Sequence, residues 1–484
     1  MPASFPLRLA ALNRLARHLT QPKFLAIWFL FCALPTGLGC ALFTPISQFA
    51  DEDAHIVRAE GVRYGEFFGI KPPPGFPPVA MNAGATVNIG ILDIFGSLEP
   101  VALWPARPAQ LASLRKAAAS QWTSLSYWPT QMVTYLPVLY TPAAAGLLAG
   151  ERLGLSPLET LFLGRLMMLA AFLLLGTAGL ALARTGAPLL FAVLTLPTTV
   201  NLAASYNQDA LLTAACVLAV ALLSRRQRWA WYGALTALSL VACVKAPYAP
   251  LLLFCLCPLA APGLWRRACG VALACLPPLL WLLHMHHFGY MVYQHAPYHP
   301  GPLWPGPRTI WLSDVEPRYN IQVLLAHPAL ILTLPVRSFG WLWPHTWPMT
   351  IGMVGCDHTM LRPWEYPCLI AALAGGLLAT ATGQPKGGAA DTGLALLALF
   401  ATFLAVELSL YITYDTAGVS AIIGVEGRYF LLFLPFFTFL PGGLSRVLPR
   451  KTVSWFCLPP VLLAALNAYA LPAYIFHIFR MPGP

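Results

Sequence analysis

The residues most able to do chemistry in this chain form an acidic run directly after its first long apolar segment. Asp51, Glu52 and Asp53 are consecutive, and His55 follows them. The preceding segment, residues 24–43, carries no charged residue and is long enough to cross a bilayer. A carboxylate at the exit of a membrane span can take a proton from a hydroxyl or bind a cation where a lipid-borne substrate meets water. Asp51 and Glu52 are therefore the candidate catalytic residues.

Residues that could hold an anionic substrate occur at three distant places in the sequence. Lys245 follows one apolar segment, Arg428 and Tyr429 precede another, and Asp209 opens a third. Carboxylates beside cations suit a phosphate-bearing lipid and a hydroxyl acceptor, because the cations hold the phosphate and a carboxylate takes the acceptor proton. We expect these four residues to bind substrate.

Each of these residues also has a plain structural interpretation. Asp209 could cap the helix that follows it. Lys245 could extend its side chain to the headgroups. Arg428 could pair with Glu426 near the surface, and the run 51–53 could be a solvated helix end. The functional interpretation is favoured because the predicted topology places all of them on one side of the membrane.

The composition excludes a soluble globular protein. Hydrophobic residues make up 58% of the chain and charged residues 10%, whereas charged residues are about a quarter of a soluble domain. The net charge of +11 comes from Lys and Arg in short loops between apolar segments, such as Arg225, Arg226 and Arg228. The positive-inside rule makes such loops cytoplasmic. The basic charge therefore indicates topology, and we expect no nucleic-acid partner.

The apolar segments predict an all-α integral membrane protein with about 11 transmembrane helices. With the basic loops inside, the N-terminus is cytoplasmic and the C-terminus periplasmic. The predicted spans are residues 24–43, 158–182, 187–204, 209–223, 229–244, 247–263, 268–284, 364–381, 392–411, 429–443 and 453–472.

Two long periplasmic segments follow from this topology, residues 44–157 and 285–363. Each contains an apolar stretch interrupted by prolines, residues 131–150 and 321–343, which we expect to be interfacial or re-entrant helices. Little length remains for a separate soluble domain, so the prediction is a single transmembrane domain over residues 1–484.

Two ionisable residues fall inside predicted spans, where charge is costly and points to function. We expect Arg165 to pair near the outer surface or to face a cavity. Glu407 is expected to be a protonated or hydrogen-bonded core residue.

Several short motifs occur in a definite order along the chain. They are Asp51-Glu52-x-x-His55-x-x-Arg58, Tyr135-Leu136-Pro137, Gly164-Arg165, Leu196-Pro197 with Ser205-x-x-x-Asp209, Lys245-x-x-Tyr248 and Gly427-Arg428-Tyr429-Phe430. Their order resembles an uncharacterised family of bacterial polytopic membrane proteins, which is similar to the GT-C superfamily of polyprenyl-phosphate-dependent glycosyltransferases. The resemblance covers most of the chain.

The resemblance implies a GT-C-like architecture with juxtamembrane helices in the first periplasmic segment, residues 44–157. It implies a catalytic carboxylate at Asp51 or Glu52 and a second acidic site at Asp209. The expected reaction is inverting transfer of a sugar from a polyprenyl phosphate donor to a glycan, lipid or protein acceptor of the cell envelope, as in polysaccharide biosynthesis.

The remaining candidate residues receive supporting roles in this scheme. Lys245 and Arg428 would stabilise the departing phosphate. Asp209 would position the acceptor or coordinate a divalent cation such as Mg²⁺ or Mn²⁺, and His55 and Arg58 would orient the acids.

The expected enzyme lies in the bacterial inner membrane with its active site facing the periplasm. Two other functions remain open at this point. A carrier or flippase for a lipid-linked saccharide needs the same cations but no base, and a non-catalytic subunit of an envelope-assembly complex needs neither.

Overall fold

A computed structural model covers residues 1–484. The residues that it describes are 18–75, 83–98, 111–225, 227–257, 263–288, 317–356, 359–381, 389–416, 418–446 and 454–480. The basic segment 447–453 and part of each long predicted periplasmic segment, residues 76–82, 99–110 and 289–316, lie outside the described residues.

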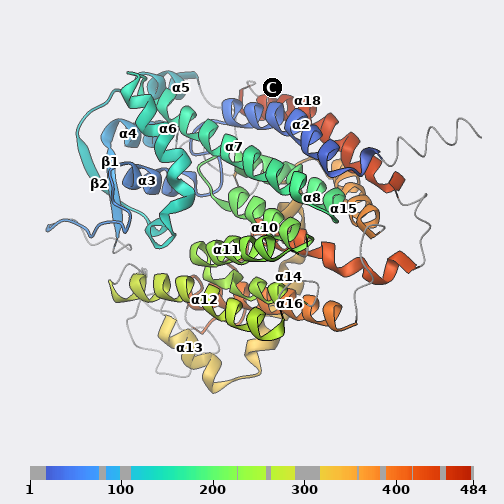
Figure 1. Ribbon diagram of the computed structural model, residues 1–484. Helices are drawn as coiled ribbons and strands as arrows, with labels where there is room; N and C mark the ends of the chain where they lie inside the picture. Colours follow the sequence, from blue (N-terminus) through green and yellow to red (C-terminus); the bar gives the residue numbers. More distant parts are fainter. Residues whose placement is uncertain are drawn as a thin grey trace, which may run out of the picture.

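Three long apolar helices pack side by side along one edge of the molecule (Figure 1). They are α2 (Pro22–Phe43), α7 (Pro157–Leu182) and α18 (Leu458–Arg480). Glycines on α2 allow the close approach. A Cβ at Gly37 would lie 2.4 Å from Leu169 of α7, and one at Gly39 would lie 2.4 Å from Pro472 of α18. Small residues at such contacts are typical of helices packed in a membrane.

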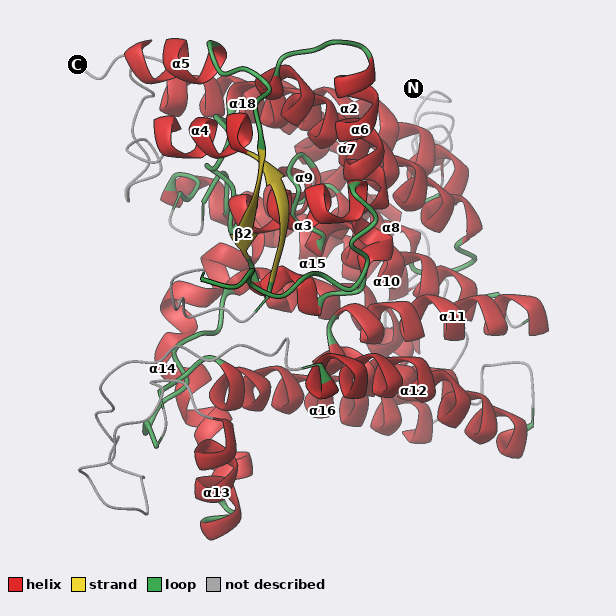
Figure 2. Ribbon diagram, turned by 90° about the vertical axis from the view of Figure 1, so that its left-hand side faces the viewer, coloured by secondary structure: helices red, strands yellow, loops and turns green. Residues whose placement is uncertain are grey.

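The segment between α2 and α7 folds into short helices and one strand pair at one end of the molecule (Figure 2). We call residues 44–157 the head region. Strands β1 and β2 pair antiparallel, with Gly84 opposite Pro129 and Asn88 opposite Leu125. Its elements are α3 (Glu52–Arg63), β1 (Gly84–Asn88), α4 (Ile89–Leu98), α5 (Leu111–Ala118), β2 (Leu125–Pro129), η2 (Gln131–Thr134), η3 (Pro137–Tyr140) and α6 (Thr141–Arg152).

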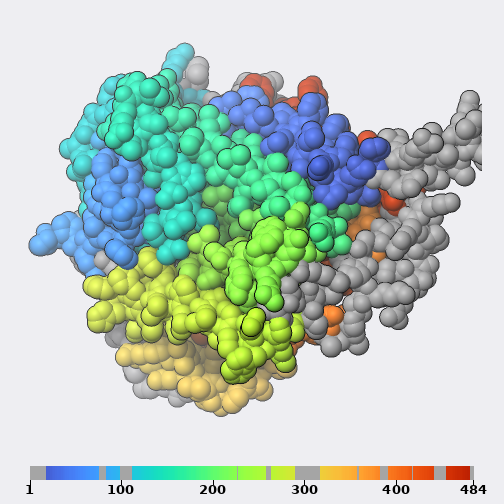
Figure 3. All heavy atoms as spheres, viewed as in Figure 1, coloured from blue at the N-terminus to red at the C-terminus, as the bar shows by residue number. Residues whose placement is uncertain are grey.

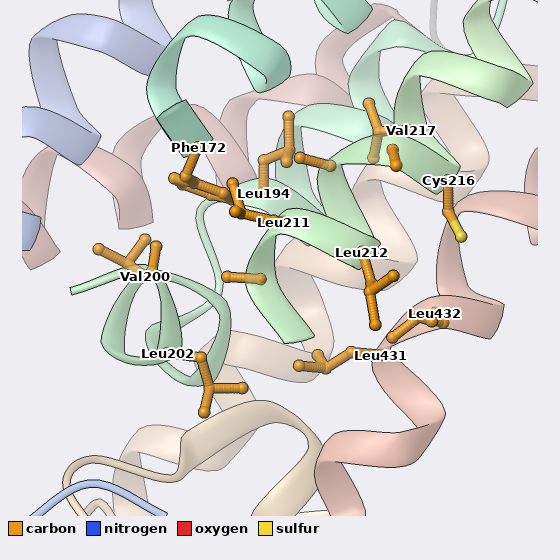
Figure 4. Close-up of a cluster of buried hydrophobic side chains, with 14 of the residues drawn as sticks. Phe172, Leu194, Val200, Leu202, Leu211, Leu212, Cys216, Val217, Leu431 and Leu432 are labelled. Carbon is orange, nitrogen blue, oxygen red and sulfur yellow. The ribbon is translucent and has the colours of Figure 1, made fainter. Parts of the chain in front are cut away.

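The centre of the molecule is built around α10 (Asp209–Leu223), which is buried along almost its whole length. Figure 4 shows its apolar side chains meeting those of α7, α8 (Ala187–Leu194), α9 (Pro197–Ala203) and η6 (Gly427–Arg446). A helix that is apolar on all faces needs apolar surroundings on all sides. Around α10 these surroundings are other helices of the protein and not lipid. Next to it lies α11 (Arg228–Val244), and the 3₁₀ helix η4 (Ala246–Leu256) packs against α11.

The remaining helices complete the fold, and some of them lie on the opposite side from α2 (Figure 1). Helix α12 (Leu264–His287) lies at the surface between the head region and α13, as Figure 3 shows in yellow, and it exposes several leucines there. An apolar helix with an exposed apolar face is suited to contact lipid. The other elements are α13 (Pro317–Ala326), α14 (Leu330–Gly352), η5 (Pro363–Glu365), α15 (Tyr366–Ala381), α16 (Ala389–Thr413) and η7 (Ser454–Cys457).

The predicted count of eleven spans is not confirmed. Among the described residues, 6 helices are long and apolar enough to cross a membrane, or up to 7 if α13 and α14, bent by 110° to each other, form one broken span or re-entrant loop. The predicted span 187–204 is divided into α8 and α9 because Pro197 follows a non-helical residue. Helix α10 has only 15 residues, and the predicted span 247–263 begins as a 3₁₀ helix.

The two proline-interrupted stretches differ from each other. Residues 131–150 form η2, η3 and α6 and contribute no candidate span in the described part of the head region. Residues 321–343 run through the bend between α13 and α14. The expectation of an interfacial or re-entrant segment therefore stays open at the second stretch, where a broken span fits equally well.

Candidate functional site

Four charged side chains from four distant parts of the sequence meet in one cluster, and one of them, Asp51, belongs to the head region. Asp51 immediately precedes α3, Asp209 is the first residue of α10, Lys245 lies between α11 and η4, and Arg428 is in the first turn of η6. All four therefore sit at the beginning or end of a helix. We call them the charge cluster.

Arg428 is the centre of the charge cluster. Its Nη2 atom lies 2.5 Å from Asp51 Oδ2 and 2.7 Å from Glu426 Oε2. Its Nε atom lies 3.7 Å from Asp209 Oδ2. The arginine side chain is 2% exposed, whereas that of Asp51 is 41% exposed. The pairing with Glu426 that the sequence suggested is present, but it belongs to a larger, partly buried network and not to an isolated surface pair.

Lys245 completes the charge cluster from the other side. Its Nζ donates a hydrogen bond of 2.6 Å to Asp209 Oδ1, so the two oxygens of that carboxylate face different cations. The ammonium also lies 4.9 Å from the ring centre of Tyr429 and 5.7 Å from that of Tyr135, distances at which a cation is attracted to an aromatic face. Tyr248 fixes this arrangement by donating to the Tyr429 carbonyl at 2.9 Å.

Asp51 has an unusual backbone conformation. Its φ of 53° lies in the left-handed region, which costs a residue with a side chain roughly 1–2 kcal/mol. This turn sends the consecutive carboxylates of Asp51 and Glu52 to different partners. Burial opposes ionisation of Asp51, but the charge and hydrogen bond of Arg428, together with the charge of Lys245, act in the other direction, and the pKa of Asp51 lies below its ordinary value. Asp51 is therefore a carboxylate at neutral pH.

Glu52 makes a separate and fully buried ion pair with Arg165. The guanidinium grips both carboxylate oxygens, with Nε 2.7 Å from Oε1 and Nη2 2.5 Å from Oε2. Its Nη atoms also donate to the carbonyl oxygens of Ala41, Thr44 and Pro45. Both side chains are 0% exposed. Arg165 was expected to pair near the outer surface or to face a cavity, and it does pair, with a carboxylate that the protein encloses.

The position of Glu52 separates the two candidate bases. Its Oε2 additionally accepts from the Ser47 backbone N–H at 3.0 Å, so both oxygens are occupied by structural donors. No acceptor hydroxyl can reach a carboxylate that is enclosed in this way. The geometry therefore favours Asp51 as the base and assigns Glu52 to holding the end of α2, the start of α3 and α7 together.

His55 lies beneath the charge cluster. Its Nδ1 is 2.6 Å from Tyr140 Oη, and its ring stacks on that of Tyr135. Burial lowers the pKa of His55 to about 4, although the charges of Asp51 and Asp209 act in the opposite direction. The ring is neutral at physiological pH and adds no charge to the site.

Arg58 does not touch the acids that it was expected to orient. It donates to the carbonyl oxygens of Glu66, Phe67 and Tyr135, at 3.1, 2.8 and 3.0 Å. It is fully buried and acts on the backbone around Tyr135. Its link to the site is thus through the position of the Tyr135 ring.

An apolar cavity of about 550 Å³ opens beside Lys245. Its walls come mainly from α12 and α16, and its polar end is formed by Lys245, Tyr135 and Tyr429. Trp281 of α12 and Leu408 and Ser409 of α16 also line the cavity. A mostly apolar cavity with a few convergent polar groups at one end is the usual form of a small-molecule site.

Sequence reasoning missed several members of this site. Tyr135 was noticed only as part of a short Tyr-Leu-Pro motif, and Tyr140 and the cavity walls were not noticed. Aromatic residues are common in membrane proteins, so only their proximity to Lys245 and His55 distinguishes these two tyrosines. The motif around Tyr135 was the one available signal.

The residues present are a poor match for the predicted divalent cation. In the described part of the chain, no group of three or more His, Cys, Asp or Glu residues could hold a metal ion. Asp209, the residue expected to bind it, has Lys245 and Arg428 against its two oxygens. The metal stays a prediction from the sequence, and no step below depends on it.

Comparison with known proteins gives one match. The family model described as "Predicted membrane protein (DUF2142)" matches residues 34–437, a range that includes every residue of the charge cluster. No curated protein and no solved structure matches the chain. The family model covers most of the sequence, and the chain therefore belongs to the DUF2142 family of membrane proteins.

Proposed function

We propose that this protein is a membrane glycosyltransferase that moves a sugar from a polyprenyl phosphate to an acceptor of the cell envelope. The observation that carries the proposal is that the charge cluster and the apolar cavity have a residue in common. Lys245 belongs both to the charge cluster and to the apolar cavity. A ligand with an apolar chain and an anionic head would place one part in each.

The cavity suits the chain of such a donor. Its α12 wall belongs to a helix with an exposed apolar face, so a lipid chain could pass between the bilayer and the cavity without crossing water. A phosphate at the end of that chain would meet Lys245 first and Arg428 next. Charge-assisted hydrogen bonds to phosphate are among the strongest available, and arginine can make two at once.

The proposed chemistry uses Asp51 as the base. Asp51 accepts the proton of the acceptor hydroxyl, and the acceptor oxygen forms a bond to the anomeric carbon. The bond between that carbon and the phosphate oxygen breaks, and the lipid phosphate leaves with the electron pair. Lys245 and Arg428 stabilise the negative charge that it gains. Attack opposite the leaving group inverts the configuration at the anomeric carbon.

The proposal extends to architecture and place in the cell. We infer a GT-C-like arrangement in the bacterial inner membrane, with the N-terminus in the cytoplasm and the C-terminus in the periplasm. The head region would then lie on the periplasmic side, as juxtamembrane helices do in that superfamily. The excess of Lys and Arg in short loops between apolar segments supports this orientation.

The test is transfer of labelled sugar from polyprenyl phosphate in proteoliposomes that contain the purified protein alone. We expect a new glycosidic bond with wild-type protein and none with Asp51→Asn. Movement of the lipid across the bilayer without a new bond would identify a carrier instead of a transferase. If the protein neither moves the lipid nor forms a glycosidic bond with any acceptor of a complete set, the result favours an assembly subunit.

A second variant tests the cavity as the site of the lipid chain. Ser409→Trp would fill the cavity from α16, and we expect donor use to fall by an order of magnitude or more. Leu397→Trp is the matched control, because Leu397 lies on the same helix and is 56% exposed. Equal activity of the two tryptophan variants would show that the lipid chain of the donor does not bind in this cavity.

A further inference from the structure

The carboxylate of Asp51 occupies the position on Arg428 that an incoming phosphate would need. Arg428 Nη2 is shared by Asp51 Oδ2 and Glu426 Oε2, at 2.5 and 2.7 Å. Both contacts are as short as the bonds that a guanidinium makes to a phosphate oxygen. The arginine assigned to the donor is thus already bound to carboxylates within the protein.

Among the described residues, the charges in contact with Arg428 or Lys245 favour the departure of one carboxylate when an anion binds. Asp51, Asp209 and Glu426 supply three negative charges, and Lys245 and Arg428 supply two positive charges. His55 is neutral, because burial lowers its pKa to about 4. A phosphate that entered this arrangement unchanged would meet a site with net negative charge.

Asp51 is the carboxylate best placed to leave. Asp209 is 2% exposed and is held by Lys245, and Glu426 is 26% exposed. Asp51 is 41% exposed and lies at the end of a helix in a left-handed conformation. A residue held in such a conformation gains from release of the contact that keeps it there.

We propose that Asp51 is an internal occupant of the phosphate site, and that the lipid phosphate displaces it from Arg428. The displacement frees the Asp51 oxygens for the acceptor hydroxyl. Donor binding would thereby precede and enable acceptor activation at the same carboxylate. This inference rests on the proposed function for the identity of the donor, and it adds the order of events.

The electrostatics of Asp51 agree with this exchange. In the resting protein the positive charge of Arg428 helps to keep the pKa of Asp51 below its ordinary value, which makes it a weak base. Once a phosphate neutralises Arg428, the same carboxylate binds a proton more readily. The base would thus become effective only when a donor is present.

The exchange predicts that removing the proposed base strengthens donor binding. The probe is a polyprenyl monophosphate without sugar, and its Kd is measured for the full-length protein in nanodiscs. We expect Asp51→Asn to bind it about ten-fold more tightly than wild type, because the phosphate no longer competes with a carboxylate for Arg428. Asp51→Gly should behave in the same way. Because glycine accepts a positive φ, this variant keeps the start of α3 intact even if Asp51→Asn disturbs it.

Asp53→Asn is the matched control. It removes the same charge two residues away, outside the contacts of Arg428 Nη2 described above, and should change Kd by less than about two-fold. Equal tightening by Asp53→Asn and Asp51→Asn would show a general charge effect and overturn the displacement. Unchanged or weaker binding by both Asp51 variants would also overturn it.

The experiment separates this inference from the proposed function. Tightening by the Asp51 variants without any sugar transfer by wild type would support the displacement and remove only the transferase. No detectable binding of the lipid phosphate to wild type or to either Asp51 variant would overturn the displacement together with the choice of donor.

Discussion

Asp51 and Glu52 are neighbours in the chain, and each pairs with an arginine at 2.5 Å, yet the two pairs differ in almost every other respect. The Glu52–Arg165 pair is closed: both side chains are 0% exposed, and backbone carbonyls occupy the rest of the guanidinium. The Asp51–Arg428 pair is open on one side, where Asp51 is 41% exposed. The difference shows that the same ion pair can build a fold or wait for a ligand, according to what encloses it.

The energetics of the two pairs follow from this enclosure. A buried charge that loses its partner has no water to replace it, and such losses cost about 3–5 kcal/mol. A half-exposed carboxylate can be solvated when it leaves, and exposed pairs contribute only about 0–1 kcal/mol. Four experiments test this difference between the two pairs.

The largest effect should come from opening the closed pair. Arg165→Met leaves Glu52 buried without its counter-charge, and we expect destabilisation by about 3–5 kcal/mol and little folded protein in the membrane. The double variant Glu52→Gln with Arg165→Met removes both charges and should recover much of the loss. Thermal unfolding in detergent checks this, and a stable Arg165→Met single variant would mean that the two pairs are alike.

The next effect concerns chemistry at the open pair. Asp51→Asn should leave the unfolding temperature close to that of wild type and lower sugar transfer by about 10²–10⁴-fold, the usual contribution of a general base. Glu52→Gln should show the reverse, with a lowered unfolding temperature as its main effect. If Glu52→Gln folded normally and was inactive while Asp51→Asn kept full transfer, the assignment of roles would be inverted.

Arg428→Lys keeps the charge of the open pair but removes the planar fork of the guanidinium. Nη2 serves two carboxylates and Nε faces Asp209, which a lysine cannot reproduce. We expect donor use to fall by roughly 10–100-fold, the equivalent of one charge-assisted hydrogen bond. Transfer kinetics at varied donor concentration measure this, and a nearly silent substitution would reduce Arg428 to a surface partner of Glu426.

The smallest effect should appear beneath the open pair, at His55. Burial lowers its pKa to about 4, whereas an unfolded histidine titrates near 6.5. Between these values the unfolded chain binds a proton that folded His55 does not. The contribution to stability is therefore complete above about pH 6.5 and is lost as the pH falls toward 4.

This linkage amounts to about 2 kcal/mol at pH 5. His55→Gln should thus lose less thermal stability than wild type when the pH is lowered from 7.5 to 5. An identical pH dependence of the two proteins would place His55 in contact with water, and the inner side of the cluster would then be as open as its outer side.

Much of the site could be predicted from the sequence, because its charged residues stand out against an apolar background. Asp51, Asp209, Lys245 and Arg428 do lie together. What could not be predicted was the division between Asp51 and Glu52. That division depends on one backbone angle and on an arginine 113 residues away, and neither is visible in a local pattern.

The predicted count of eleven spans is not confirmed, for a related physical reason. Hydropathy measures whether a segment avoids water and does not report whether lipid or protein surrounds it. Helix α10 is as apolar as a span, but at 15 residues it is short and enclosed by other helices. The predicted spans around it therefore included helices that belong to the core of the protein.

The number of residues between the partners of each ion pair determines how long after the first partner the ribosome adds the second. Glu52 meets an arginine 113 residues later, whereas Asp51 meets its arginine 377 residues later. At about 5–20 residues per second, the ribosome supplies the first partner within roughly 6–23 s and the second only after roughly 19–75 s. The Glu52–Arg165 pair can thus form early in synthesis, whereas the charge cluster stays incomplete until Arg428 has been made.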